Sequence, residues 1–247
     1  MRLRYTSFLF MIIIVYYAFS GRFVYGTKIT IVGYYIPGVP YVMQEDPYWC
    51  GPACLTMVLR YWGVNITQKE IAAEIYDPVT HLTYISDMEK YPRRFNFTVE
   101  SIFSDMDELK EFIREGYPVI VLQKYSLTNT YGHFRVVIGY NDKTKIVMTN
   151  DPLKHANFTI SYSDFKELWK PGSTFSTTNW TLLIYKPGEK TPQTPIPIYG
   201  TEELKNEWLV TTLITSAAVI LVLTFVIFII KIKKRHEHSI RGDLTYL

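Results

Sequence analysis

Four residues of types that support nucleophilic chemistry occur in informative settings: Gln44, Cys50, His133 and Asp151. A thiol attacks as its thiolate, and a helix N-terminus or a nearby imidazolium lowers its pKa from ~8.5 to ~3.5–7.5. Cys50 is followed by a Gly-Pro pair, and proline suits the first turn of a helix. We therefore expect Cys50 at a helix start, where the helix dipole favours an anion.

The other three residues are of the types that a thiol nucleophile needs as partners. His133 leads a predicted strand and can accept the thiol proton. Asp151, at the end of the next predicted strand, can hold the second ring nitrogen and fix the tautomer. Gln44 lies six residues before Cys50 and can donate an amide N–H to a developing oxyanion, beside the backbone N–H of Cys50. Taken singly, each residue is more often a packing, structural or turn residue, and only the combination favours catalysis.

Three helices are predicted in the first half of the chain. The first starts at Cys50, carries apolar residues at helical spacing and ends at Gly63. The second begins at Thr67, which forms a capping box with a glutamate three residues later. The third begins near Ser104 and stops at Gly116.

The second half of the chain has the pattern of a sheet. Residues 118–123 are a short, mostly apolar run, as in a buried strand. Further strands are expected at 133–140, 145–149 and 180–185, with a short helix at 164–169. Helices precede an antiparallel sheet, so the predicted fold class is α+β.

Two segments carry a family resemblance. The segment Gln44-Glu-Asp-Pro-Tyr-Trp-Cys50-Gly-Pro-Ala-Cys, continuing to Gly63, resembles the nucleophile segment of the bacteriocin-processing (double-glycine leader) peptidases, family thirty-nine of the cysteine peptidases. Residues 132–140, followed by Asn150-Asp151-Pro152, resemble that family's histidine strand and Asp-Pro turn. The resemblance covers residues 42–185.

This resemblance implies a papain-like fold, with N-terminal helices packed on an antiparallel sheet, and a peptide or protein as the substrate. It implies that Cys50 is the nucleophile, His133 the general base, Asp151 the residue that orients the histidine, and Gln44 the oxyanion donor. It implies no cofactor, and the remaining histidines of the domain show no metal-ligand spacing.

Two neighbouring residues leave alternatives open. Cys54, one helical turn after Cys50, is interpreted as a small apolar core residue or as a redox partner. Arg135 shares the strand face of His133 by two-residue alternation. It either lies near the cleft, where it would favour acidic groups, or is solvated at the strand edge.

The ends of the chain have a separate pattern. Residues 1–20 resemble a signal peptide, residues 27–186 are expected to form the domain, and the proline-rich residues 187–207 an extended stalk. Residues 208–230 are long and apolar enough to predict a helix that spans the lipid bilayer. The basic residues 231–247 are then expected on the cytoplasmic side. The predicted location is the cell membrane, crossed once, with the domain on the extracytoplasmic side.

Charge and sequons agree with an exported domain. Four Asn-X-Thr triplets lie between the two apolar segments, at Asn65, Asn96, Asn157 and Asn179. The net charge of +3 owes much to the C-terminal tail, so no nucleic-acid partner is expected.

The expected function is therefore that of a membrane-anchored extracytoplasmic cysteine peptidase, which hydrolyses surface or exported proteins through a Cys-His-Asp triad. Two alternatives use the same fold: a catalytically inactive binding or adhesion domain, and an acyl transferase that cross-links through the same residues. The relatives that clip leader peptides face the cytoplasm, so a double-glycine leader is not the expected substrate.

Overall fold

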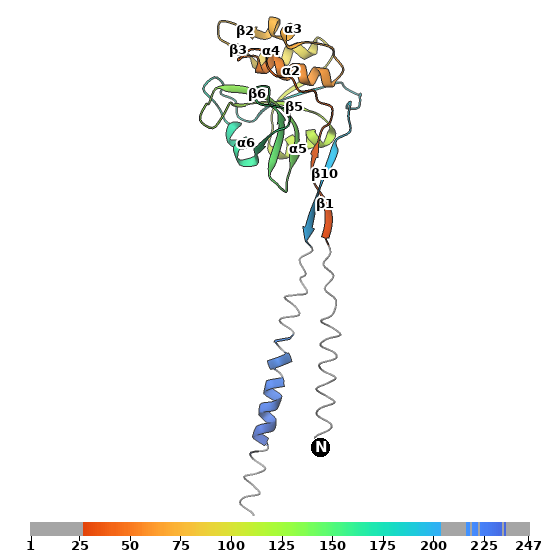
Figure 1. Cartoon of the computed structure of the whole chain (residues 1–247), viewed down its shortest axis with the longest axis vertical. Helices are drawn as coiled ribbons and strands as arrows, with labels where there is room; N and C mark the ends of the chain where they lie inside the picture. The colour runs from red at the N-terminus through yellow and green to blue at the C-terminus, as the bar shows by residue number, and fades with distance from the viewer. Residues whose placement is uncertain (1–26, 204–215, 218, 222, 234, 236–247) are drawn as a thin grey trace, which may run out of the picture. The chain divides into compact units, whose positions relative to one another are not determined.

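The computed structural model describes residues 27–203, 216, 217, 219–221, 223–233 and 235 (Figure 1). Residues 29–201 form one compact unit, and the remaining described residues belong to a second. The predicted signal peptide, residues 1–20, and most of the predicted cytoplasmic tail lie outside the described residues.

Over the described residues, the compact unit 29–201 is built on an eight-stranded sheet, with the strand order β10-β1-β6-β5-β9-β4 and with β7 and β8 added beside β6. Its central strand, β6, pairs antiparallel with β5, β1 and β7. The strands are β1 (Thr27–Tyr35), β4 (Thr98–Phe103), β5 (Val119–Lys124), β6 (Gly132–Asn141), β7 (Ile146–Asn150), β8 (Phe158–Ser161), β9 (Trp180–Tyr185) and β10 (Ile196–Glu203).

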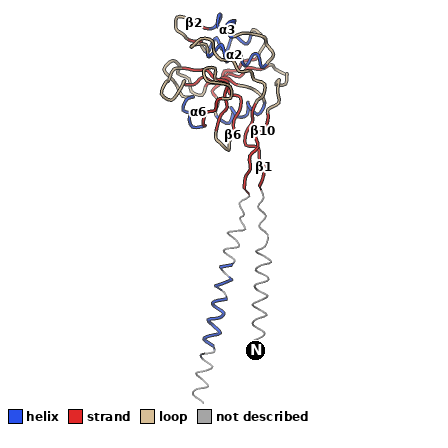
Figure 2. Tube along the Cα trace, viewed as in Figure 1, coloured by secondary structure: helices blue, strands red, loops and turns tan. Residues whose placement is uncertain are grey.

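Helices α2 (Cys50–Tyr61), α3 (Gln68–Ile75) and α4 (Ile85–Arg93) gather on one side of the sheet together with the hairpin of β2 (Tyr76–Asp77) and β3 (Leu82–Thr83) (Figures 1 and 2). Helices α5 (Met106–Glu115) and α6 (Tyr162–Leu168) pack against the strands. The domain thus has a helical half and a sheet half, which confirms the predicted α+β layout.

Helix α2 is the most deeply buried helix of the helical half. Almost all of its residues are buried, from Gly51 to Leu59 without a break, as expected for a helix that is apolar on every face. It packs against α3, α4 and β6. Its first residue, Cys50, is therefore held in a fixed position relative to β6.

Local sequence signals set the other helix ends as predicted. Thr67 and Glu70 form a capping box at the start of α3. Asp105 caps α5, and Gly116 follows that helix in the left-handed conformation, with φ of 90°, which a residue with no Cβ adopts without steric cost.

The predicted stalk needs a correction. Residues 196–203 are not an extended linker but strand β10, which pairs with β1 at the edge of the sheet. The segment before it also contacts the domain, because Thr191 Oγ1 donates to the Glu115 carbonyl over 3.3 Å. The compact unit therefore reaches residue 201, beyond the predicted domain end at 186. The prolines misled the prediction, since proline is tolerated on an edge strand.

The prediction of a membrane-spanning helix over 208–230 is wrong. Among the described residues, no helix is both long enough and apolar enough to cross a membrane. Residues 208–215, 218 and 222 lie outside the described part.

Candidate active site

Cys50 opens α2 at the boundary between the two halves of the domain. The thiol is half-buried, and both cysteines of the chain are free. Gly51 follows because a side chain would not fit there: a Cβ on Gly51 would lie 2.8 Å from Cγ2 of Thr83. Cys54 is fully buried in the apolar core, which agrees with the interpretation of this residue as a core residue.

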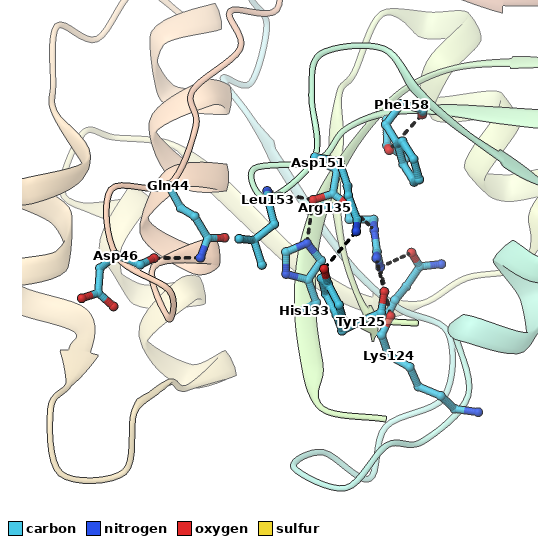
Figure 3. Close-up of polar contacts among 12 residues, drawn as sticks. Gln44, Asp46, Lys124, Tyr125, His133, Arg135, Asp151, Leu153 and Phe158 are labelled. Atoms are coloured by element: carbon cyan, nitrogen blue, oxygen red, sulfur yellow. Dashed lines mark hydrogen bonds and ion pairs between the residues drawn. The ribbon is translucent and has the colours of Figure 1, made fainter. Parts of the chain in front are cut away.

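His133 and Asp151 come together from two neighbouring strands. His133 is the second residue of β6, and Asp151 directly follows β7. His133 Nε2 lies 2.8 Å from Asp151 Oδ1 (Figure 3). Asp151 Oδ1 also accepts the backbone N–H of Leu153 over 2.9 Å. The ring of Tyr125 packs edge-on against the imidazole, with 5.5 Å between centroids.

The structure excludes one of the two alternatives for Arg135, a side chain solvated at the strand edge. The residue is 1% exposed, and its Nε donates to Asp151 Oδ2 over 2.8 Å (Figure 3). Both carboxylate oxygens of Asp151 are therefore occupied, one by His133 and the other by Arg135. Sequence reasoning placed Arg135 on the correct strand face but missed its partner.

Gln44 lies across from His133, on the helical side of the site. Its Nε2 donates to the Asp46 carbonyl over 2.7 Å, and its Oε1 is buried without a hydrogen-bond partner among the described residues. Figure 3 shows the amide nitrogen turned toward Asp46 and away from His133. The backbone N–H of Gln44 donates to the Pro152 carbonyl over 3.0 Å, which ties this loop to the turn that carries Asp151.

A cavity of ≈ 680 Å³ joins the helical and sheet halves. Cys50 and His133 both line it, although no hydrogen bond joins the thiol to the imidazole within the described chain. The other residues on its wall include no Asp, Glu, Lys or Arg, and several are aromatic, including Tyr48, Tyr84 and Tyr131.

The protonation states follow from burial. Burial raises the pKa of the Cys50 thiol, and backbone hydrogen bonds from Phe134 and Gly51 oppose this. Burial lowers the pKa of His133, and the Arg135 charge acts in the same direction, against Asp151. At neutral pH the resting pair is therefore a thiol and a neutral imidazole, whereas the sequence argument expected a thiolate.

Asp151 is ionised at rest. Burial alone would raise the pKa of this carboxyl, but the hydrogen bond from His133 and the charge of Arg135 together hold the pKa far below its ordinary range. An ionised Asp151 accepts the proton of His133 Nε2. The neutral ring then carries its lone pair on Nδ1, the nitrogen that can act as a base.

A thiol at a helix start and an imidazole on a facing antiparallel sheet, separated by a cleft, define a papain-like cysteine peptidase. The model of the Peptidase_C39-like family matches residues 36–176, more than half of the chain. The chain belongs to this family, and the peptidase domains of the family are cysteine peptidases.

One curated relative is the pediocin PA-1 transport/processing ATP-binding protein PedD of Pediococcus acidilactici. It is 26% identical over 187 residues, which cover 72% of this chain and 24% of that protein. The chain thus spans about a quarter of the length of this relative.

Solved structures with a similar fold include a putative C39-like peptidase from Bacillus anthracis, at 17% identity and a TM-score of 0.49, covering 63% of this chain and 99% of that one. The peptidase domain of Streptococcus ComA has 20% identity, a TM-score of 0.46, and coverages of 60% and 99%. A double glycine motif protease from an AMS/PCAT transporter, in complex with its leader peptide, has 20% identity, a TM-score of 0.46, and coverages of 62% and 97%.

Proposed function

We propose that this protein hydrolyses peptide bonds with Cys50 as nucleophile, His133 as general base and Asp151 as the residue that orients the imidazole. One observation carries the proposal: the His133–Asp151 pair is fully buried, yet the imidazole and the Cys50 thiol line the same cavity. A domain used only for binding would need no such pair beside a thiol.

The reaction has two steps. Cys50 Sγ attacks the carbonyl carbon of the substrate as Nδ1 of His133 accepts the thiol proton, and the imidazolium that forms is stabilised by Asp151. His133 then gives this proton to the leaving amine, the C–N bond breaks, and a thioester remains on Cys50. In the second step, water loses a proton to His133 and attacks the thioester, which releases the acid and restores the thiol.

The oxyanion is stabilised by the backbone N–H of Cys50 and by the amide of Gln44. In the free protein, Gln44 Nε2 donates to the Asp46 carbonyl over 2.7 Å. Because the nitrogen faces Asp46 in the free protein, the side chain must rotate when the substrate binds. The unpartnered Oε1 favours such a rotation, since its present position leaves a buried acceptor unsatisfied.

The cavity wall supports peptide segments with uncharged side chains as the substrate. No Asp, Glu, Lys or Arg is among the residues that line it, so a charged substrate side chain would lose water without gaining a carboxylate, ammonium or guanidinium group as its partner. Peptides or proteins with uncharged residues on both sides of the cleaved bond are therefore the proposed substrate class.

The proposed site of action is outside the cytoplasm. The support is the signal-peptide pattern of residues 1–20 together with the sequons. Three of the four sequon asparagines, Asn65, Asn96 and Asn157, are exposed, as an attached glycan requires. Protease added to intact cells tests this location separately from the activity, because it should reach the domain if the domain lies outside the cytoplasm.

A peptide-library digest tests the activity. The full chain and its C50A variant are incubated under reducing conditions with a library that has charged or uncharged residues around each bond, and new termini are read by mass spectrometry. We expect cleavage between uncharged residues by the wild type alone. Termini that persist with C50A, or their absence from both digests, would overturn the proposal. Adding a free amine to the digest separates hydrolysis from acyl transfer.

A further inference from the structure

A buried cation, Arg135, lies behind the His133–Asp151 pair and takes no part in the proton transfers described above. It is 1% exposed, and burying a charge without partners is expensive. His133 and Arg135 are two residues apart on β6, so both side chains leave the same face of the strand. The guanidinium is therefore built into the wall that holds the imidazole.

All three guanidinium nitrogens donate hydrogen bonds. Nε donates to Asp151 Oδ2 over 2.8 Å. Nη1 donates to Gln123 Oε1 over 3.2 Å and to the Lys124 carbonyl over 3.1 Å. Nη2 donates to the Tyr125 carbonyl over 2.7 Å. Three of the four acceptors belong to the end of β5 and the residue after it, so this strand fixes the plane of the guanidinium.

Gln123 is itself immobilised. It is fully buried, and its Nε2 donates to the Phe165 carbonyl at α6 over 3.0 Å. The chain of contacts therefore runs from α6 through Gln123 and Arg135 to Asp151, and from there to His133. Because the guanidinium is planar and its Nη atoms are already held, its Nε–H can point toward a carboxylate oxygen in only one direction.

We propose that Arg135 is a positioning residue: it fixes the Asp151 carboxylate through Oδ2, so that Oδ1 is aimed at His133, and its buried charge adds to the effect of burial in disfavouring the imidazolium. This inference rests on the proposed role of His133 as the base. A fixed carboxylate sets the direction of the imidazole, and a neutral imidazole is the form that can accept the thiol proton.

Several charged and titratable groups surround His133, and they lie on different elements of the fold. They are Cys50 of α2, Tyr125 after β5, Arg135 of β6, Asp151 after β7, and Lys154 in the loop that follows. Asp151 favours the imidazolium, whereas Arg135 and Lys154 disfavour it. Lys154 is exposed, so solvent screens its charge, whereas the charge of Arg135 is buried.

The experiment separates the charge of Arg135 from its geometry. The variants are R135M, which loses both, and R135K, which keeps the charge but has no planar fork. The matched control is R114M, which removes an exposed arginine whose Nη1 lies 2.6 Å from Glu111 on the same helix. The readouts are an NMR titration of the His133 imidazole without substrate, assigned with H133Q, and kcat/KM against pH.

In R135M we expect the His133 titration midpoint and the acid limb of kcat/KM to move upward together. In R135K both should stay in place while kcat falls about 100-fold, because a carboxylate misplaced by ~1 Å misaligns the base. R114M should change neither quantity. An unchanged His133 midpoint in a folded R135M overturns the proposal.

If R135M does not fold, the R135K variant tests the positioning role of Arg135. A lower kcat with an unmoved midpoint supports positioning, and an unchanged kcat in folded R135K overturns it. A purely structural role would lower the yield of folded protein and leave the midpoint and the kcat of the folded fraction unchanged.

The titration needs no substrate, so the two claims fail separately. A midpoint that moves in R135M, in a protein that cleaves no peptide, would remove the proposed function and leave the charge effect on His133 standing. If the wild type cleaves peptides but the His133 titration midpoint does not change in R135M, the proposed function stands and the proposed role of Arg135 is overturned.

Discussion

The sheet half of the cleft carries His133, Asp151 and Arg135, each at most 2% exposed. Two hydrogen bonds of 2.8 Å join Asp151 to the other two residues. On the helical half, the Cys50 thiol is half-buried and Gln44 turns its amide nitrogen toward Asp46. The base is thus preassembled in the free protein, whereas the oxyanion donor is not. Preassembled groups lose little entropy at the moment of reaction. The substrate must supply the energy that completes the other half.

The largest expected effect comes from breaking the preassembled half with D151N. Arg135 Nε requires an acceptor, so the amide oxygen of asparagine would face Arg135 and its NH₂ group would face His133 Nε2. The imidazole would then carry its proton on Nδ1, where it cannot accept the thiol proton. We expect kcat/KM to fall by ~10⁴-fold, as when a triad histidine is held in the wrong tautomer.

Steady-state kinetics on a cleaved library peptide measures this loss. Thermal unfolding of D151N serves as the control for folding, since the substitution removes a buried charge beside Arg135. A folded D151N with kcat/KM within about tenfold of the wild type would contradict the assignment of Asp151, given that general base catalysis contributes ~10²–10⁴-fold.

The next effect probes the incomplete half through Q44A. Loss of one oxyanion donor costs ~10²–10³-fold in kcat. Because Gln44 reaches the oxyanion only after rotation, we expect the loss in kcat with little change in KM. Q68A is the matched control: it removes a second buried glutamine, which holds the same loop through the Met43 carbonyl, and should affect stability more than kcat. An unchanged kcat in Q44A would exclude Gln44 as an oxyanion donor.

These two halves were not equally predictable from sequence. Cys50 could be placed at a helix start because a Gly-Pro pair is a local signal. His133 and Asp151 could be paired because adjacent antiparallel strands bring their ends together. Their catalytic roles, like that of Gln44, stay predictions until an activity is measured.

The role of Arg135 could not be predicted from alternation alone, which gives a strand face but not its burial. A signal was present: Arg135 precedes Val136, Val137 and Ile138, an apolar run typical of a strand buried on both faces. A cation in such a strand needs a buried anion, and Asp151 was already expected on the next strand. Residues 196–203 had no comparable signal, because their pairing with β1 depends on a strand some 160 residues earlier.

The pH dependence of activity tests the resting protonation states. Since burial lowers the pKa of His133, the imidazole stays neutral below its ordinary pKa of ~6.5, and kcat/KM should hold its plateau there before falling on further acidification. Since burial raises the pKa of Cys50 above its ordinary value, alkylation of the thiol by iodoacetamide should accelerate only on the alkaline side. Rapid alkylation near pH 5 would mean a resting thiolate and contradict this account.

The same pKa shift makes a stability prediction of definite sign. The unfolded chain binds a proton at His133 at higher pH than the folded chain does, so the free energy of unfolding should fall as the pH drops below ~6.5. The H133Q variant should lack this part of the slope. Thermal unfolding of both proteins across that range measures the difference, and equal slopes would contradict a lowered pKa of His133.

The smallest expected effect comes from G51A. A Cβ there would lie 2.8 Å from Cγ2 of Thr83 and 3.1 Å from Sδ of Met88. Overpacking of this kind costs ~1–3 kcal/mol, and thermal unfolding should register it. The double variant G51A/T83S removes the clashing methyl group and should recover part of the loss. Full stability in G51A would show that β3 yields easily beside Cys50.

The most direct test of the central claim, that a thiol on the helical half is activated by a base on the sheet half, is covalent labelling. The wild type, H133A and C50A are treated at pH 7 with an uncharged peptide vinyl sulfone, and the adducts are located by tandem mass spectrometry. We predict one adduct, on Cys50, formed at least ~100-fold more slowly in H133A and absent from C50A. Labelling of Cys54, or equal rates in the wild type and H133A, would contradict the account.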